Sequence, residues 1–144
     1  RPSGYFNSKA QKIKAFVQHL GERYGDDLEA LLSQDVPSLR EELLSIYGIG
    51  YETADDILLY AANKPSFVID VYTRRVIQRL GLAPGEDTYR AYQDLFHSNL
   101  PMDTYMYNEY HALLDHHAKE TCRKIPLCSG CCLRDICLTG KESR

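Results

Sequence analysis

All five cysteines of the chain lie near its C-terminal end, and their spacing could support metal chemistry. Four of them, Cys122, Cys128, Cys131 and Cys137, are separated by five, two and five residues, and Cys132 is left over. Four thiolates can hold a [4Fe–4S] cluster or a structural zinc ion, and the spacing alone does not separate the two. We interpret Cys132 as a bystander packed beside the site.

The crowding of the cysteines also bears on the cell compartment. A secreted disulfide scaffold usually spreads its cysteines along the chain. Here they occupy sixteen residues, and we expect no export signal, so we interpret them as a metal or cluster site in a reducing compartment. Arg123 and Lys124 lie in the loop between the first two cysteines, and a metal-clamped loop is predicted to present them to phosphate.

A second candidate site is the sequence Gly48-Ile49-Gly50, which lies between two predicted helices. Glycines allow a tight turn and a close approach of the backbone to a ligand, while Ile49 can point inward. Amides at the start of the following helix can then bind a phosphate. A plain turn between packed helices is the alternative, but the flanking helices favour a DNA-binding hairpin that includes Tyr51 and Thr53.

Asp70 is the third candidate, because it follows a proline-containing loop and precedes a predicted helix. Aspartate is among the commonest helix N-caps. A fixed carboxylate can also stabilise the cationic sugar formed when an N-glycosidic bond breaks, and it can direct water to that sugar. The two roles are compatible, and the hairpin upstream favours the catalytic one.

The elements that must position these residues are predicted to be helices, because apolar residues recur at helical spacing. Asn7 or Ser8 is expected to cap the first helix, and Pro37 suits the first turn of a later one. No segment alternates as a strand would, and residues 67–69 are too few to assign. The predicted helices cover residues 8–20, 28–32, 37–46, 52–61, 71–80, 87–97 and 103–119.

Composition and charge are compatible with a folded protein of one ordinary domain or two small ones. The chain has 144 residues, of which 44% are hydrophobic and 26% are charged. No apolar run approaches the roughly 20 residues that a membrane span needs. The net charge of −3 argues mildly against a nucleic-acid partner, although a local basic patch can outweigh it.

Taken together, these features resemble the endonuclease III family of helix-hairpin-helix DNA glycosylases. The matching positions occur in the family's order, and they are Asn7-Ser8-Lys9-Ala10, the hairpin, Val68-Ile69-Asp70, Arg75-Val76, His111 and the cysteine loop. The first cysteine gap is five residues, where six is usual in the family. The resemblance nevertheless favours [4Fe–4S] over zinc.

The resemblance implies an all-α fold of two parts. Residues 1–63 would form the helix-hairpin-helix part of a six-helix barrel, which further N-terminal helices complete in the family. Residues 64–144 would form a helical domain that carries the catalytic Asp70 and the iron–sulfur cluster. The implied partner is double-stranded DNA with a damaged base. We expect a monomer in the cytoplasm of a bacterium or archaeon, associated with the nucleoid and not with a membrane.

The most informative departure from the family pattern is Glu52. Bifunctional members carry a lysine at this position, and its amine forms a Schiff base with the sugar. A carboxylate cannot form an imine, so the resemblance implies a monofunctional glycosylase in which water attacks. Stabilisation of Glu52 by the helix macrodipole is the simpler alternative. A glycosylase–lyase that uses another amine, and a non-catalytic DNA-binding module, stay open as alternative functions.

The stretch from Gly48 to Asp55, followed by Ile57-Leu58, resembles the 3-methyladenine glycosylase branch of the family, which points to an alkylated base as the substrate. Tyr72 stands where many endonuclease III proteins have a histidine near the catalytic aspartate, which suggests an altered pocket.

The remaining polar residues receive simpler interpretations. His111, His116 and His117 are expected to have surface or packing roles. Three arginines follow Asp70 and form either a basic face near DNA or ordinary surface charges, and they are Arg74, Arg75 and Arg79.

Overall fold

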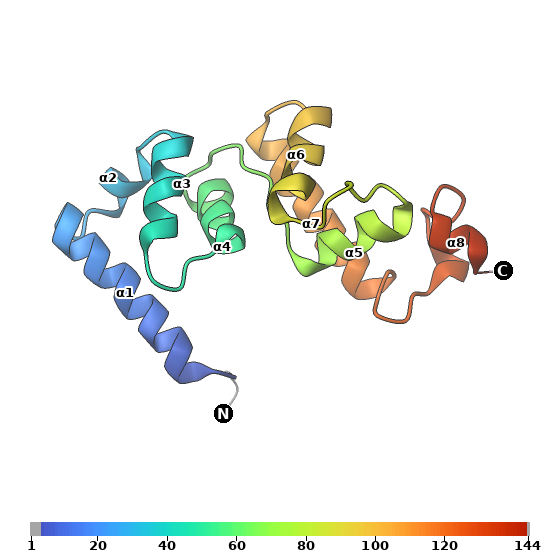
Figure 1. Cartoon of the computed structure of the whole chain (residues 1–144), viewed down its shortest axis with the longest axis horizontal. Coiled ribbons are helices and arrows are strands. Elements are labelled where there is room, and N and C mark those ends of the chain that lie inside the picture. The colour runs from blue at the N-terminus through green and yellow to red at the C-terminus, as the bar shows by residue number, and fades with distance from the viewer. Residues whose placement is uncertain (1–3, 144) are drawn as a thin grey trace. The chain divides into compact units, whose positions relative to one another are not determined.

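The computed structural model describes residues 4–143, and this part of the chain contains helices and no strand (Figure 1). The all-helical prediction is confirmed. The chain divides into two compact units, Arg1–Ser66 and Phe67–Arg144, which we call the hairpin unit and the cysteine unit. The predicted boundary after residue 63 lies in the loop that precedes this division.

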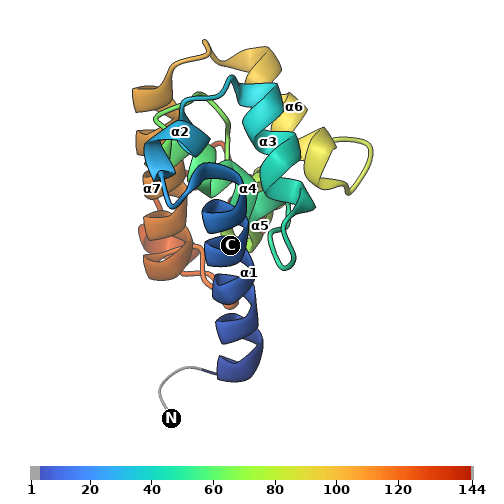
Figure 2. The ribbon, with the colours of Figure 1, turned by 90° about the vertical axis from the view of Figure 1, so that its left-hand side faces the viewer.

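The hairpin unit is built from four α-helices and a π-helical turn (Figures 1 and 2). Helix α4 passes directly into the π-helix η1, and the hydrogen bond from the Ala62 amide to the Ile57 carbonyl, at 2.9 Å, has the wider π-helical spacing. The elements are α1 (Phe6–Tyr24), α2 (Leu28–Leu32), α3 (Val36–Ser45), α4 (Tyr51–Asp56) and η1 (Ile57–Ala61).

Side-chain capping explains where α2 and α3 begin. The Asp27 carboxylate accepts a hydrogen bond from the Ala30 amide at the start of α2, and Asp35 does the same at α3. The predicted cap of α1 is wrong, because Asn7 and Ser8 lie inside the helix. Tyr5 adopts a left-handed backbone conformation, with φ of 54°, and its carbonyl accepts the Lys9 amide, so the helix begins earlier.

The core of the hairpin unit consists of buried leucines and other apolar residues from four elements and the hairpin. Helix α3 packs against both α4 and η1. The hairpin is thereby held by burial of apolar surface, which contributes about 25 cal/mol per Å². The fully or nearly fully buried members are Leu31, Leu39, Leu43, Ile46, Ala54 and Leu58.

A buried ion pair links α3 to α4. The Asp55 side chain has no exposed surface, and both of its oxygens accept hydrogen bonds from the Arg40 guanidinium, at 2.8 and 2.9 Å. The Ser66 hydroxyl donates a third bond to Asp55, at 2.7 Å. Because removal of one partner would leave a buried charge uncompensated, this pair fixes the helix that follows the hairpin.

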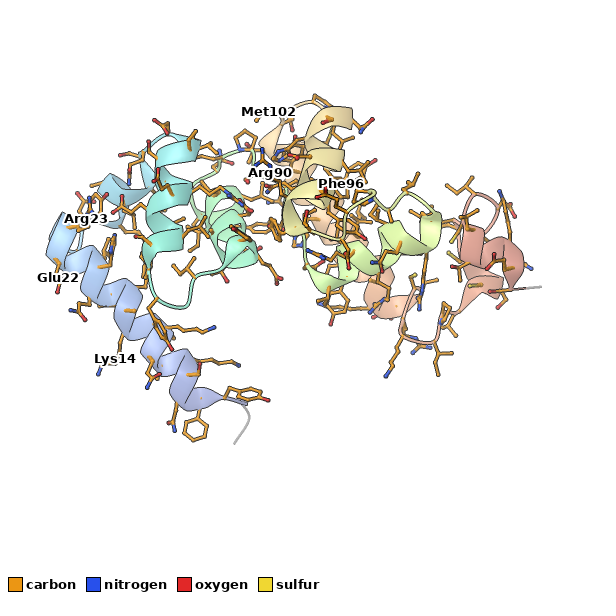
Figure 3. The ribbon with its side chains drawn as sticks, in the orientation of Figure 1. Lys14, Glu22, Arg23, Arg90, Phe96 and Met102 are labelled. Atoms are coloured by element: carbon orange, nitrogen blue, oxygen red, sulfur yellow. The ribbon has the colours of Figure 1, made fainter. Side chains whose placement is uncertain are left out.

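A second polar network centres on Glu42 in α3. Its carboxylate accepts hydrogen bonds from Tyr24 at 2.6 Å and Gln34 at 2.7 Å, and it lies 2.7 Å from the His19 Nε2 atom. Arg23, which extends from the last turn of α1 (Figure 3), lies 3.3 Å away. Burial alone would raise the pKa of Glu42, but the hydrogen bonds and the arginine lower this pKa from 4.5 to about 2.

The cysteine unit contains three longer helices and two short ones. Helix α5 packs against α7 and against α8. Asp70, Thr88 and Asp103 cap α5, α6 and α7 through their side-chain oxygens, so the predicted N-cap role of Asp70 is confirmed. The elements are α5 (Val71–Leu80), α6 (Tyr89–Asn99), α7 (Thr104–Glu120), the 3-10 helix η2 (Cys128–Gly130) and α8 (Leu138–Glu142).

The extended segment Phe67–Ile69, which leads into Asp70, is the centre of this unit's core. Its three side chains are buried. The Phe67 ring stacks on the Phe96 ring of α6, with centroids 3.8 Å apart, and meets the Tyr107 ring edge-on at 5.3 Å. Sequence reasoning left these three residues unassigned because the stretch is too short, and in the structure they form no helix or strand.

The Glu42 network predicts a specific acid sensitivity of folding. Since the folded-state pKa is depressed, Glu42 stabilises the fold above its ordinary pKa of 4.5, and this contribution is lost as the pH falls towards about 2. Glu42→Gln should therefore be less stable than wild type in urea unfolding at about pH 6, and the difference should shrink at about pH 3. The exposed neighbour variant Glu41→Gln is the control. A stability difference independent of pH would contradict the prediction.

Candidate DNA-repair site

The hairpin has the backbone that sequence reasoning predicted at Gly48. This residue has φ of 87°, and a Cβ atom there would collide with the Lys12 side chain, so glycine is required for both reasons. Gly50 has ordinary extended dihedrals and open space where a Cβ would lie. The turn therefore does not require a glycine at position 50, but the missing side chain leaves the backbone accessible. Ile49 packs against the core, as predicted.

Helix α4 begins directly after the hairpin, with Gly50 as its N-cap. Gly50 has no side chain that could accept the first amides of the helix. The Tyr51, Glu52 and Thr53 side chains are exposed at this end, and the Arg40 guanidinium lies 5.3 Å from the centre of the Tyr51 ring. The helix start therefore combines accessible backbone with exposed side chains, which is the arrangement expected of a phosphate contact.

Asp70 occupies a half-buried position at the start of α5. Its Oδ1 atom accepts the Thr73 amide at 2.6 Å, and its Oδ2 atom lies 3.8 Å from the Nε2 atom of His111 on α7. Burial alone would raise the pKa of Asp70, but His111 and Thr73 together hold it below the ordinary value of 3.8. The carboxylate is thus kept ionised.

The Lys119 side chain also interacts electrostatically with this carboxylate. The Lys119 ammonium is 5.2 Å from the centre of the Tyr72 ring and 2.7 Å from the Asp115 carboxylate. Asp115 is the main cause of a raised Lys119 pKa, and the charge of Asp70 adds to it. Sequence reasoning missed the part played by His111, which it assigned to the surface or to packing.

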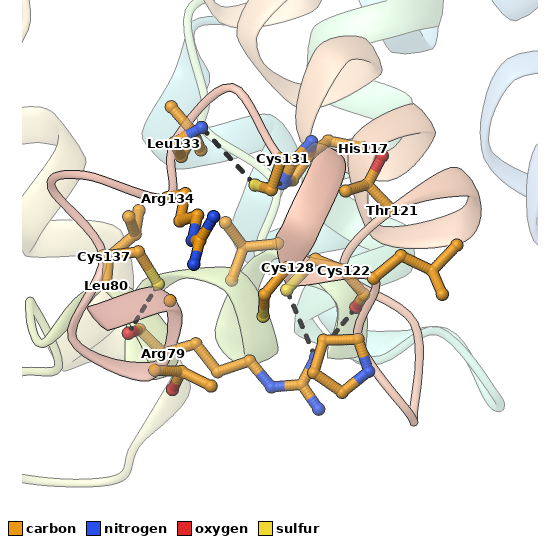
Figure 4. Close-up of a pocket in the computed structure, with 15 residues that line it drawn as sticks. Arg79, Leu80, His117, Thr121, Cys122, Cys128, Cys131, Leu133, Arg134 and Cys137 are labelled. Carbon is orange, nitrogen blue, oxygen red and sulfur yellow. Dashed lines mark hydrogen bonds between the residues drawn. The ribbon is translucent and has the colours of Figure 1, made fainter. Parts of the chain in front are cut away.

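The four cysteines of the predicted ligand set line one cavity between α5, α7 and the C-terminal loops (Figure 4). Cys132 is exposed and does not line this cavity. Burial raises the pKa of the Cys131 thiol. Within residues 4–143, no three histidine, cysteine or acidic side chains are placed so that they could share one metal ion.

The three arginines of α5 differ in their contacts. Arg75 and Arg79 donate hydrogen bonds to backbone carbonyls at the end of α7 and in the cysteine loop. Arg74 pairs with Asp87 at 3.0 Å on the surface. The interpretation as ordinary surface charges is therefore wrong for Arg75 and Arg79, whereas the basic face near DNA stays a prediction. Their donors serve the fold because they satisfy carbonyls that no helix would otherwise pair.

The comparison with known proteins identifies the family. Residues 1–102 match the HhH-GPD superfamily of base excision DNA repair proteins, and the chain belongs to this superfamily. A candidate DNA repair glycosylase of Methanocaldococcus jannaschii is 45% identical over 140 residues, which cover 96% of this chain and 64% of that protein. Endonuclease III of Sulfolobus acidocaldarius is 34% identical over 138 residues, or 95% of this chain and 59% of that protein.

A solved structure shares the fold. The structure of a trapped endonuclease III–DNA covalent intermediate, an estranged-adenine complex, matches with a TM-score of 0.79 at 24% identity and covers 96% of this chain and 61% of that one. The predicted resemblance to the endonuclease III family is confirmed. The chain spans about three fifths of the length of these relatives. None of the helices in residues 4–143 has the length and apolar character that crossing a membrane requires.

The contact between His111 and Asp70 yields a testable pH dependence. Because His111 helps to lower the pKa of Asp70, His111→Gln should raise the midpoint at which the Asp70 carboxyl protonates. NMR titration of the Asp70 carboxyl carbon measures this midpoint directly. His116→Gln, an exposed substitution on the same helix, is the control and should leave it unchanged. Equal midpoints in His111→Gln and wild type would show that Thr73 alone holds the carboxylate.

Proposed function

We propose that this chain is the part of a base-excision DNA glycosylase that carries the catalytic carboxylate, and that Asp70 is this residue. The observation that carries the proposal is the environment of Asp70, which is half-buried, held by the Thr73 amide and kept ionised beside His111. Membership of the HhH-GPD superfamily supports the same function.

The chemistry follows from the charge of this carboxylate. Glycosylases flip the damaged nucleotide out of the duplex before they act on it. Loss of the base leaves positive charge on the sugar, and an ionised carboxylate that is already fixed in place stabilises this charge without reorganisation. Asp70 also accepts a proton from the water that attacks the sugar. A protonated Asp70 would do neither, and the lowered pKa favours the ionised form that both roles need.

DNA binding is proposed for the hairpin and for the cysteine loop. The backbone of Gly48, Ile49 and Gly50 approaches a phosphate closely, and the start of α4, with Tyr51 and Thr53, completes this contact. The side chains of Arg123 and Lys124 are exposed in the cysteine loop, where they bind further phosphates. Such contacts position the duplex without reading its sequence.

We propose that Cys122, Cys128, Cys131 and Cys137 hold a [4Fe–4S] cluster. All four line the same cavity, and their thiolates are the ligands that such a cluster takes. When bound, the cluster ties the loop together, and Asp70 performs its chemistry without it.

The proposal for Asp70 is tested by Asp70→Asn. Asparagine also caps helices well, so DNA binding and folding should survive while base release from damaged duplex falls about a hundredfold or more. Asp103→Asn is the matched control, because Asp103 caps α7 through a bond of the same length, 2.6 Å, to the Met106 amide.

Base release should be measured on the intact protein, with duplexes that carry 3-methyladenine, uracil, mismatched thymine or an oxidised pyrimidine. The preferred lesion then identifies the substrate branch. Normal base release by Asp70→Asn would contradict a catalytic role. If the wild type released no base from any duplex, the remaining interpretation would be a non-catalytic DNA-binding module.

We further propose that the enzyme is monofunctional, because Glu52 stands at the start of α4 where a lyase lysine would act. Wild-type product should break only after hot alkali, and borohydride should trap no covalent adduct. Glu52→Lys should gain a trapped adduct because it supplies the amine, whereas the control Glu52→Gln should not.

One amine could support the alternative of a glycosylase–lyase. The aliphatic stem of Lys12 lies against Gly48 of the hairpin and lines a cavity that also includes Thr53. A wild-type adduct that disappears in Lys12→Met would overturn the monofunctional proposal and identify this lysine as the nucleophile.

A further inference from the structure

Arg79, in the last turn of α5, makes several hydrogen bonds to the cysteine loop. Its guanidinium donates to three consecutive carbonyls, those of Cys122 at 3.1 Å, Arg123 at 2.6 Å and Lys124 at 3.0 Å. It also donates to the Cys122 sulfur at 3.2 Å (Figure 4). The planar fork of arginine donors suits such a row of acceptors.

The backbone of Arg79 contacts a second cysteine. The Cys137 thiol donates a hydrogen bond to the Arg79 carbonyl at 3.1 Å. Arg79 therefore touches the first and the last of the four cysteines in the cavity, and it belongs to the same helix that begins at Asp70.

Arg75, one turn earlier on α5, provides an internal comparison. It donates to the Cys122 carbonyl and to the Ala118 carbonyl, each at 2.8 Å. Both of these contacts are to backbone oxygens. Arg75 and Arg79 thus share the role of holding the loop backbone, whereas the hydrogen bond to a cysteine sulfur belongs to Arg79.

We propose that Arg79 is a positioning residue for the cysteine loop and that its hydrogen bond to the Cys122 sulfur raises the reduction potential of the cluster held there. The inference rests on the cofactor proposed above. Reduction adds negative charge to a cluster, and a cationic donor at a ligand sulfur stabilises that charge. The three carbonyl contacts keep the guanidinium in place, so the donor is fixed before the cofactor binds.

The test compares four forms of the chain after anaerobic reconstitution with iron and sulfide. The measured quantities are iron and sulfide content, the rate of iron loss to a chelator, and the midpoint potential from voltammetry. Arg79→Gln should lower the potential and speed iron loss roughly tenfold or more. Arg75→Gln should speed iron loss and lower the potential less than Arg79→Gln does, because Arg75 donates to the Cys122 carbonyl and not to its sulfur. Arg74→Gln, which alters the surface pair with Asp87, should change neither.

The outcomes separate this inference from the cofactor proposal. If the cluster assembles and the potential of Arg79→Gln equals that of wild type, the inference is wrong and the cofactor stands. If wild type takes up zinc but no iron and sulfide, both are overturned. Should Arg79→Gln not fold, Arg79→Lys keeps the charge but loses the forked geometry, and an unchanged potential in that variant also overturns the inference.

Discussion

The placement of Asp70 depends on a buried stretch of backbone that belongs to no helix or sheet. Residues 67–69 are buried, and buried amides and carbonyls must find partners. Side chains of α6 supply them, because the Phe67 amide donates to His97 at 3.1 Å and the Gln93 side chain donates to the Phe67 carbonyl at 2.8 Å. The segment therefore has one conformation, and the carboxylate that follows it has one position.

Helix α5 extends this constraint from Asp70 to the cysteines. At its first turn the Thr73 amide binds the Asp70 carboxylate, and at its last turn Arg79 binds the cysteine loop. The helix also packs along α7, which contributes His111 to Asp70 and ends just before Cys122. A short rigid element thus holds both the proposed acid–base chemistry and the proposed cofactor site, so the loop cannot shift without affecting the helix that Asp70 caps.

Sequence reasoning predicted the features that depend on neighbours in the chain and missed those that depend on distant ones. Helix positions, the Asp70 cap and the left-handed Gly48 follow from local rules of periodicity, capping and backbone sterics. The contacts of His111 and Arg79 join residues more than forty positions apart, and no spacing rule reaches that far. The N-terminal cap failed for a different reason, because Tyr5 adopts a conformation that non-glycine residues seldom take.

The structure also changes what the hairpin sequence says about the substrate. The resemblance to the 3-methyladenine branch rests on residues 48–55 and on Ile57-Leu58, but packing alone accounts for two of these positions. Gly48 is required by its dihedrals and by Lys12, and the buried Asp55 is required as the partner of the Arg40 guanidinium. Neither residue needs a damaged base to explain it. Glu52 is exposed in the first turn of α4 and is the position in this stretch that bears on the reaction. Its identity concerns which nucleophile attacks the sugar, and not which base is removed.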